Sequence, residues 1–240
     1  MSLENAVGDW YPLLNPLFKS KGFENIRTEI KTYKANGAKV LPDTRMTFRA
    51  FKECQYEKVQ VVILGQDPYH DGRANGLAFA NNSSLGYVSP SLRNIWKSLE
   101  TDFDVLEVDF DHSLETWARQ GVLLLNTALT VEKGQAGSHL DLWRPFTERF
   151  ITTLTESKDG LVFMLWGKKA QYFEKFIKGN QHVLKAAHPA AEVYSGGKAG
   201  FFTCKHFTKA NELIDFPIRW SDRCTTVPIV TGKQNQTILR

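Results

Sequence analysis

Four short and almost wholly apolar runs divide the chain, at residues 59–64, 121–125, 161–166 and 182–187. Runs of this length with few polar interruptions are typical of strands that are buried on both faces of a sheet. The stretches between them carry apolar residues at helical spacing, as Leu92, Ile95 and Leu99 do. Helices are predicted at residues 9–20, 44–53, 91–100, 113–120, 145–157, 168–178 and 208–215.

This alternation of strands and helices predicts an α/β fold. Crossovers of this length imply a central, mainly parallel four-stranded sheet with helices on both faces. No repeat, low-complexity block or long linker interrupts residues 1–220, so we expect one domain there. Residues 221–240 form a separable tail with three open interpretations: disorder, an extra edge strand through residues 226–230, or a partner-binding segment.

Composition narrows the class of protein. No apolar stretch approaches the roughly 20 residues of a membrane span, and the first residues lack the pattern of a secretory signal. We therefore expect an intracellular protein without a membrane partner, in the cytoplasm or, in a eukaryote, in the nucleus or mitochondrion. We also expect a monomer, because no apolar heptad is present. Cys54, Cys204 and Cys224 are odd in number and far apart, so all three are interpreted as thiols. The net charge of +4 is too small to indicate a polyanionic partner by itself.

Polar or glycine-bearing segments follow each of the four predicted strands. Parallel strands end at the same edge of a sheet, so Asp67, Asn126, Lys168 and His188 should converge around one cleft. Singly, Asp67 could be a helix cap, Asn126 a turn residue and His188 a buried structural histidine. Pro68 stiffens the loop that carries Asp67, which suits a positioned catalytic acid.

The residues of that loop are similar to the hallmark of family 1 uracil-DNA glycosylases: Gly65-Gln66-Asp67-Pro68-Tyr69-His70. Further blocks between residues 9 and 220 resemble the family in the same order. These blocks are Leu123-Leu124-Leu125-Asn126, Gln135 with Ser138-His139, Trp143 with Phe146-Thr147, Leu165-Trp166-Gly167, His188-Pro189, Phe201-Phe202 and His206-Phe207.

The resemblance implies a DNA repair hydrolase of base excision repair. Such an enzyme flips uracil out of single- or double-stranded DNA and hydrolyses its N-glycosidic bond, without a metal, an organic cofactor or a lyase step. Asp67 would position water and stabilise the oxocarbenium-like sugar. His188 would act as a neutral imidazole that donates a hydrogen bond to uracil O2, although the sequence does not fix its tautomer. Protein inhibitors and replication proteins are the further partners that the family suggests.

The resemblance also assigns the uracil-binding residues. Asn126 would read N3–H and O4, Phe79 would stack on the flipped base, Tyr69 would exclude the methyl group of thymine, and Gln66 belongs to the same group. For Phe79, a role as an ordinary core aromatic is the alternative. DNA contacts are assigned to His70, Ser91, Lys168, Val193, Tyr194 and Lys198.

These DNA contacts carry open alternatives. His70 and Ser91 could equally be cap or turn residues, whereas the lysines would make binding weaken steeply with salt. The stretch after Pro189 departs from the family, because it is longer and lacks the leucine that wedges into the duplex. Either Val193 or Tyr194 supplies the wedge, or flipping is supported differently and duplex activity suffers. Glu192 is expected to place a negative charge beside the phosphate backbone.

Two other functions compete with the glycosylase. One is a uracil-DNA binding or replication-accessory module without turnover, which the presence of both Asp67 and His188 disfavours. The other is an unrelated α/β enzyme that acts on a small phosphorylated substrate. The sequence contains neither a Gly-x-Gly-x-x-Gly motif nor a Gly-Lys-Ser/Thr phosphate loop, which disfavours the second.

Overall fold

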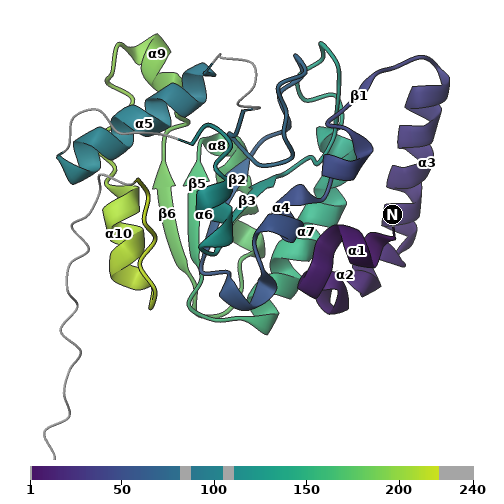
Figure 1. The fold of residues 1–240 in the computed structure, drawn as a ribbon, viewed down its shortest axis with the longest axis horizontal. Coiled ribbons are helices and arrows are strands. Elements are labelled where there is room, and N and C mark those ends of the chain that lie inside the picture. The colour runs from purple at the N-terminus through teal and green to yellow at the C-terminus, as the bar shows by residue number, and fades with distance from the viewer. Residues whose placement is uncertain (1, 82–87, 105–110, 222–240) are drawn as a thin grey trace, which may run out of the picture.

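A parallel sheet forms the centre of the computed structural model, which describes residues 2–81, 88–104 and 111–221 (Figure 1). The strand order is β3-β2-β5-β6, with neighbouring strands parallel throughout, as predicted. Each strand lies within a residue or two of its predicted run. The four strands are β2 (Val61–Gly65), β3 (Val122–Asn126), β5 (Val162–Trp166) and β6 (His182–Ala186).

One strand is less buried than predicted. Every residue of β2, β3 and β5 is buried, but β6 is only half-buried and Lys185 within it is exposed. The expectation that all four strands are buried on both faces is therefore wrong for β6. Edge position alone does not explain the difference, because β3 lies at the opposite edge and is fully buried. Helices α4 and α6 both pack on β3, whereas among the described elements β6 has its main contacts with β5.

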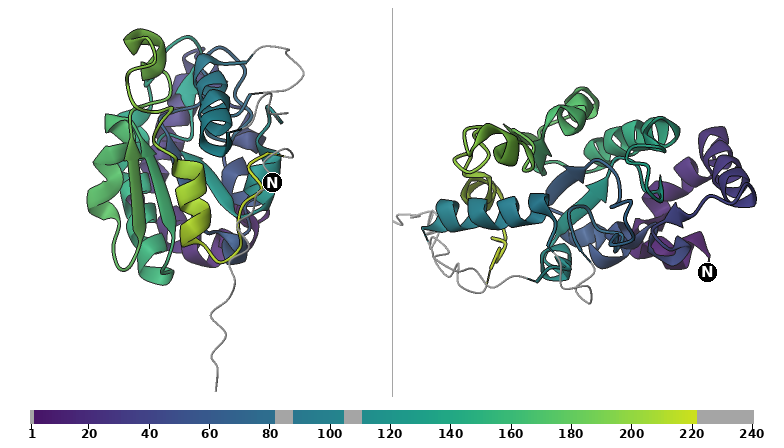
Figure 2. Two further views of the ribbon diagram at one scale, coloured as in Figure 1. Left: turned by 90° about the vertical axis from the view of Figure 1, so that its left-hand side faces the viewer. Right: turned by 90° about the horizontal axis from the view of Figure 1, so that it is seen from above.

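Helices cover both faces of the sheet (Figure 2). On opposite faces, α8 and α10 both contact β5. Each of the seven predicted helical segments contains helix, although the segment at residues 168–178 is α8 followed by a 3-10 turn, not one helix. These helices are α2 (Tyr11–Phe18), α4 (Arg49–Glu53), α5 (Pro90–Phe103), α6 (Glu115–Arg119), α7 (Leu140–Ser157), α8 (Lys168–Gln171) and α10 (His206–Leu213). The 3-10 turns are Gly8–Trp10, Thr44–Met46, Tyr56–Lys58 and Tyr172–Phe176.

Several elements were not predicted. The longest is α3 (Lys21–Ala35), in which only Phe23 and Ile26 are buried. Its start is fixed by Ser20, whose hydroxyl accepts a hydrogen bond from the Phe23 N–H over 3.2 Å. The others are short: α1 (Leu3–Val7), α9 (Ala191–Ser195) and an antiparallel pair of β1 (Val40–Leu41) with β4 (Val131–Glu132).

The hydrophobic core contains the inner faces of these helices and the three fully buried strands, β2, β3 and β5. Cys54 and Cys204 are free thiols, as expected, whereas Cys224 and the predicted tail beyond residue 221 lie outside the described residues. None of the helices in the described part of the chain has the length and apolar character needed to cross a bilayer.

Candidate active site

The carboxylate of Asp67 lies just after the end of β2 and is held in one orientation. Its Oδ1 accepts a hydrogen bond from Gln66 Nε2 at 2.8 Å, and its Oδ2 accepts one from the Gly137 N–H at 2.5 Å. Two donors on opposite oxygens leave the carboxylate little rotational freedom. The sequence-based alternative, a helix cap, does not describe these contacts, because neither donor begins a helix.

Asn126 ends β3 directly beside Gly65, its register partner at the end of β2. A side chain at position 65 would collide with Asn126 Oδ1, and its Cβ would also lie 2.8 Å from the Cβ of Ala78. The glycine therefore lets the Asn126 amide lie across the strand end. Asn126 is only 7 % exposed, and within the described part of the chain its side-chain amide makes no hydrogen bond. The amide is not among the fully buried polar atoms that lack a partner, so a ligand at the strand end can reach it.

Tyr69 and Phe79 are joined at the same edge. The Tyr69 hydroxyl lies 2.5 Å from Ser89 Oγ and donates to the carbonyl oxygen of Phe79 at 3.3 Å. Phe79 has φ of +64°, which is rare for a residue with a side chain and is found preferentially at functional sites. Its ring centroid lies 5.5 Å from that of Trp166 and 6.0 Å from that of His188. Phe79 is thus both a core aromatic and a neighbour of the imidazole.

His188 follows β6 and packs against the end of β5. Gly167, with φ of +84°, permits the approach, because a Cβ there would lie 2.8 Å from the His188 Cβ. The backbone N–H of Ala190 donates to His188 Nδ1 at 3.1 Å, so the neutral ring carries its proton on Nε2. Burial lowers the pKa of the imidazole below 6.5, and the positive charge of Lys169 lowers it further. The ring is therefore neutral at physiological pH.

The segment after His188 contains the short helix α9. Val193 and Tyr194 are 59 % and 90 % exposed, as a DNA-inserting tip requires. Glu192 is only 3 % exposed, and its carboxylate accepts hydrogen bonds from backbone N–H groups of the same loop. The expectation that Glu192 places its charge beside DNA phosphates is therefore wrong. The loop folds around this side chain, so the carboxylate points inward.

The remaining predicted DNA contacts lie around the same edge. Lys168 and Lys198 are exposed, and His70 and Ser91 are half-buried. Ser91 is not the cap of α5, because Ser89 occupies that position and accepts from the Leu92 N–H at 3.2 Å.

Two contributors to the site were missed by sequence reasoning. One is the backbone N–H of Gly137, which no residue-type signal reveals. The other is Ser89, which bonds to Tyr69. A serine before a proline at a helix start does indicate a cap, but it does not identify a tyrosine partner. Asn75 is buried and braces its own loop, because its Oδ1 accepts a hydrogen bond from the Leu77 N–H at 3.0 Å.

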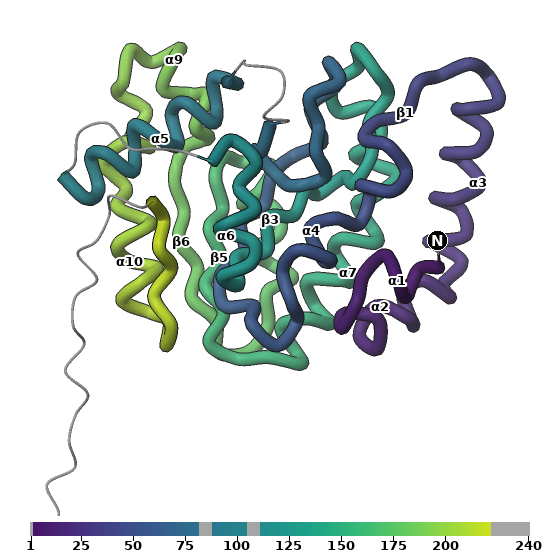
Figure 3. The backbone as a smooth tube through the Cα atoms, in the orientation of Figure 1, coloured from purple at the N-terminus to yellow at the C-terminus, as the bar shows by residue number. Residues whose placement is uncertain are grey.

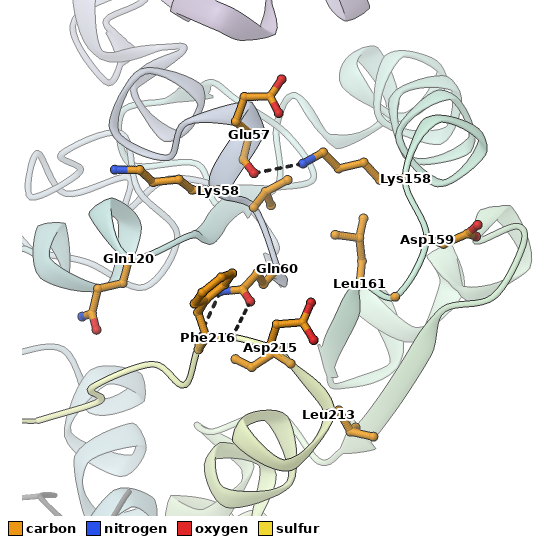
Figure 4. A pocket seen from close by; sticks show the side chains of 13 residues that line it. Glu57, Lys58, Gln60, Gln120, Lys158, Asp159, Leu161, Leu213, Asp215 and Phe216 are labelled. Atoms are coloured by element: carbon orange, nitrogen blue, oxygen red, sulfur yellow. Dashed lines mark hydrogen bonds between the residues drawn. The ribbon is translucent and has the colours of Figure 1, made fainter. Parts of the chain in front are cut away.

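A separate cavity lies at the other end of the sheet, where the strands begin (Figure 4). It has a volume of about 620 Å³, and none of its described lining residues is a predicted site residue. Gln60 accepts from the Phe216 N–H and donates to the Phe216 carbonyl, both at 3.1 Å. Lys158 donates to the Glu57 carbonyl at 3.3 Å. These polar groups are engaged within the protein, unlike the Asn126 amide.

Comparisons with known proteins agree on one family. The family model described as the uracil DNA glycosylase superfamily matches residues 51–215. The uracil-DNA glycosylase of Pectobacterium carotovorum subsp. carotovorum is 41 % identical over 221 residues, which cover 89 % of this chain and 95 % of that protein. The uracil-DNA glycosylase of Xanthomonas axonopodis pv. citri is 43 % identical over 227 residues, which cover 92 % of this chain and 89 % of that protein.

Solved structures show the same fold. A variant of mimivirus UNG in complex with UGI has a TM-score of 0.83 and 23 % identity, and the match covers 92 % of this chain and 91 % of that one. UNG from Nitratifractor salsuginis has a TM-score of 0.63 and 22 % identity, with 88 % of this chain and 94 % of that one covered. At these identities the structures support the fold, while the sequence relatives establish the family.

Proposed function

This chain belongs to the uracil-DNA glycosylase family, and from that membership we propose which of its residues carry out the reaction. The enzyme removes uracil from DNA by hydrolysing the N-glycosidic bond, a step of base excision repair. As the bond breaks, the sugar becomes cationic and the uracil anionic, so the site must stabilise two opposite charges. We assign Asp67 to the sugar and His188 to the base.

Asp67 positions the attacking water and stabilises the developing sugar cation. Support comes from its two hydrogen bonds, which fix the carboxylate before substrate arrives. A preoriented charge needs no reorganisation as the transition state forms, and this is where electrostatic catalysis gains most. Gln66 contributes by donating a hydrogen bond to Oδ1 of Asp67. We therefore assign Gln66 a role in orienting Asp67, in addition to its predicted role in binding uracil.

His188 stabilises the negative charge that gathers on uracil O2. The observation that carries this assignment is the hydrogen bond from the Ala190 N–H to Nδ1, which leaves the proton on Nε2. A neutral imidazole in that tautomer is a hydrogen-bond donor at physiological pH. The low pKa of the ring keeps it neutral, and the nearby positive charge of Lys169 favours an anion at the same place.

Asn126, Phe79 and Tyr69 select the base. The unengaged amide of Asn126 offers both a donor and an acceptor, which match O4 and N3–H of uracil and mismatch cytosine. Phe79 provides the stacking surface beside His188. Tyr69 is held by its hydroxyl at both Ser89 and Phe79, so its ring forms a rigid wall against the methyl group of thymine.

The exposed residues around this edge bind the DNA strand. We assign phosphate contacts to His70, Ser91, Lys168 and Lys198, and the wedge to Tyr194 ahead of Val193 because Tyr194 is the more exposed. An aromatic ring in the gap left by the flipped base would stack with the neighbouring bases. We also propose a protein inhibitor as a partner of this chain. The solved complex of mimivirus UNG with UGI supports this proposal. A monomer remains our expectation.

The test of this proposal is excision from a uracil-containing single-stranded oligonucleotide, read out by alkaline cleavage of the abasic sites. Asp67→Asn and His188→Ala should each lower turnover by at least about a hundredfold, the scale of one transition-state group. His182→Ala and Asp215→Asn are matched controls at the opposite end of the sheet and should retain activity. Near-normal turnover in either site variant would contradict the assignment.

A further inference from the structure

The loop between His188 and Phe202 is built around a buried carboxylate. We infer that Glu192 is a positioning residue that holds the DNA-inserting tip, Val193 and Tyr194, in place before DNA binds, and that it thereby supports excision from duplex DNA. This inference rests on the proposed function of the tip. It assigns to Glu192 no contact with DNA or with the reacting atoms.

The carboxylate of Glu192 is satisfied almost entirely by the backbone of its own loop. Oε2 accepts from the Ala199 N–H at 3.0 Å, and Oε1 accepts from the N–H groups of Phe201 and, at 3.2 Å, Phe202. Among the described residues no lysine or arginine pairs with it. A buried carboxylate without a cation is tolerated only when several donors face it. Glu192 therefore ties the first half of the loop to the second.

Helix α5 holds both ends of the same loop. Asn94 Nδ2 donates to the Pro189 carbonyl at 2.8 Å, and Ser98 Oγ donates to the Phe201 carbonyl at 3.2 Å. Figure 3 shows α9 and α5 at the same end of the molecule. Helix α5 also carries Ser91, the predicted phosphate contact. Ser91 and the tip are therefore linked through α5 and its hydrogen bonds to the loop.

Without the hydrogen bonds to Glu192, the middle of the loop could adopt many backbone conformations. Gly196, Gly197 and Gly200 all have positive φ, and glycine loses more conformational entropy on ordering than any other residue. A tip that had to become ordered only on entering the duplex would bear that entropic cost at the binding step. The hydrogen bonds to Glu192 order the loop when the protein folds, so this entropic cost is not incurred when DNA binds.

The consequence is specific to the kind of substrate. In duplex DNA the flipped base leaves a gap in the stack, and an inserted side chain compensates for the lost stacking. A single strand has no such gap to fill. Loss of the Glu192 contacts should therefore weaken excision from duplex DNA while leaving excision from a single strand unchanged.

The experiment compares kcat/KM on matched single-stranded and duplex uracil oligonucleotides for Glu192→Gln, Tyr194→Ala, Val193→Ala and the double variants. Glutamine keeps one acceptor oxygen but turns an NH₂ group toward backbone N–H groups. We expect Glu192→Gln to lower duplex kcat/KM about tenfold, the size of one stacking contact, with single-stranded kcat/KM unchanged. One of the two tip variants, Val193→Ala or Tyr194→Ala, should lower kcat/KM on duplex DNA alone. Adding Glu192→Gln to that variant should lower duplex kcat/KM little further, because both changes remove the same inserted group.

Asp102→Asn is the matched control for a structural effect. The Asp102 carboxylate accepts from the backbone N–H groups of Phe207 and Thr208 at 3.0 and 3.3 Å, so it has the same chemistry at the start of α10. Its loss should affect both substrates equally. Equal losses on both substrates for Glu192→Gln, or full additivity with the tip variant, would overturn the inference. Single-stranded activity that persists in every variant shows that the proposed function stands whichever way this result falls.

Discussion

The backbone N–H of Ala190 donates to Nδ1 of His188 over 3.1 Å, and this one contact decides which nitrogen of the ring carries the proton. An imidazolium has no acceptor nitrogen, so protonation of His188 would break the bond. Burial and the charge of Lys169 already disfavour the protonated form, as the lowered pKa shows. The loop thus selects a neutral donor through a backbone N–H.

Removal of the Lys169 charge should raise the pKa of His188. Because burial is the larger cause of the lowering, Lys169→Gln should move the pKa upward but leave it below 6.5. In the role proposed for His188 the ring must be neutral, so the fall of kcat toward low pH should begin at a higher pH in the variant. NMR titration of the His188 ring in the free enzyme and kcat against pH on single-stranded DNA would measure both effects.

Lys168→Gln is the control for this pair of measurements, since it removes the same charge one residue away. Lys168 is not among the groups that lower the His188 pKa. The two variants should therefore differ in the ring titration. Indistinguishable titrations, or a downward shift in Lys169→Gln, would count against the assignment.

Discrimination against thymine should depend on how firmly Tyr69 is held. Tyr69→Ala removes the wall and should permit detectable excision of thymine. Ser89→Ala removes one partner of the hydroxyl and should have a smaller effect in the same direction. The measurement is the ratio of thymine to uracil excision on otherwise identical oligonucleotides. No thymine excision by Tyr69→Ala would refute the role of the ring.

Ser89 also caps α5, so a control must separate the two roles. Ser20 caps α3 with the same geometry, since each serine accepts from a backbone N–H three residues on at 3.2 Å. Loss of either cap should lower the free energy of unfolding by about 1 kcal/mol. Only Ser89→Ala should alter the thymine-to-uracil ratio, and a change in Ser20→Ala would assign the effect to stability.

The sequence predicted the sheet and the ends of its strands well, for a physical reason. Fully buried parallel strands have to be apolar runs, and parallel order brings their carboxyl ends together, so Asp67, Asn126 and His188 could be placed at one edge from spacing alone. The prediction omitted α3, although Phe23, Ile26, Ile30 and Tyr33 recur there at helical spacing. The segment is polar on average and buries only Phe23 and Ile26, so it does not stand out as a core element.

The contacts that orient the site could not be predicted in the same way. Gly137 and Ala190 act through backbone N–H groups, which every residue except proline possesses, so residue type carries no signal. Glu192 illustrates the converse problem, because a charged residue in a loop near DNA is expected to face outward. Its direction is decided by the N–H groups that the folded loop offers, and these exist only once the loop has formed.

Gly65→Ala should disable recognition of uracil. The new methyl group would collide with Asn126 Oδ1 and lie 2.8 Å from the Cβ of Ala78, which belongs to the core. The Asn126 amide would have to move, and misplacement of a recognition group typically costs about a hundredfold in rate. Excision kinetics with a thermal melt would separate this loss from unfolding. Gly22→Ala on α3 is the control and should retain activity, because its Cβ would meet only Ser20 Oγ, in ordinary contact at 3.8 Å. Equal activity in both variants would contradict the prediction.

The stability of the protein should fall in acid because of His206. Its Nδ1 accepts from Trp166 Nε1 at 3.0 Å, and burial, with a smaller effect of Lys209, lowers its pKa to about 4. The unfolded chain binds the proton near pH 6.5, so the stabilisation is complete above that pH and is lost as the pH falls toward 4. The pKa difference corresponds to about 3 kcal/mol at most. Urea unfolding at several pH values measures how the free energy of unfolding depends on pH. This dependence should be weaker for His206→Gln than for the unchanged protein, and equal pH dependence in both would contradict the prediction. Since Trp166 packs on Phe79 at 5.5 Å, protonation of His206 would also loosen the stacking surface of the site.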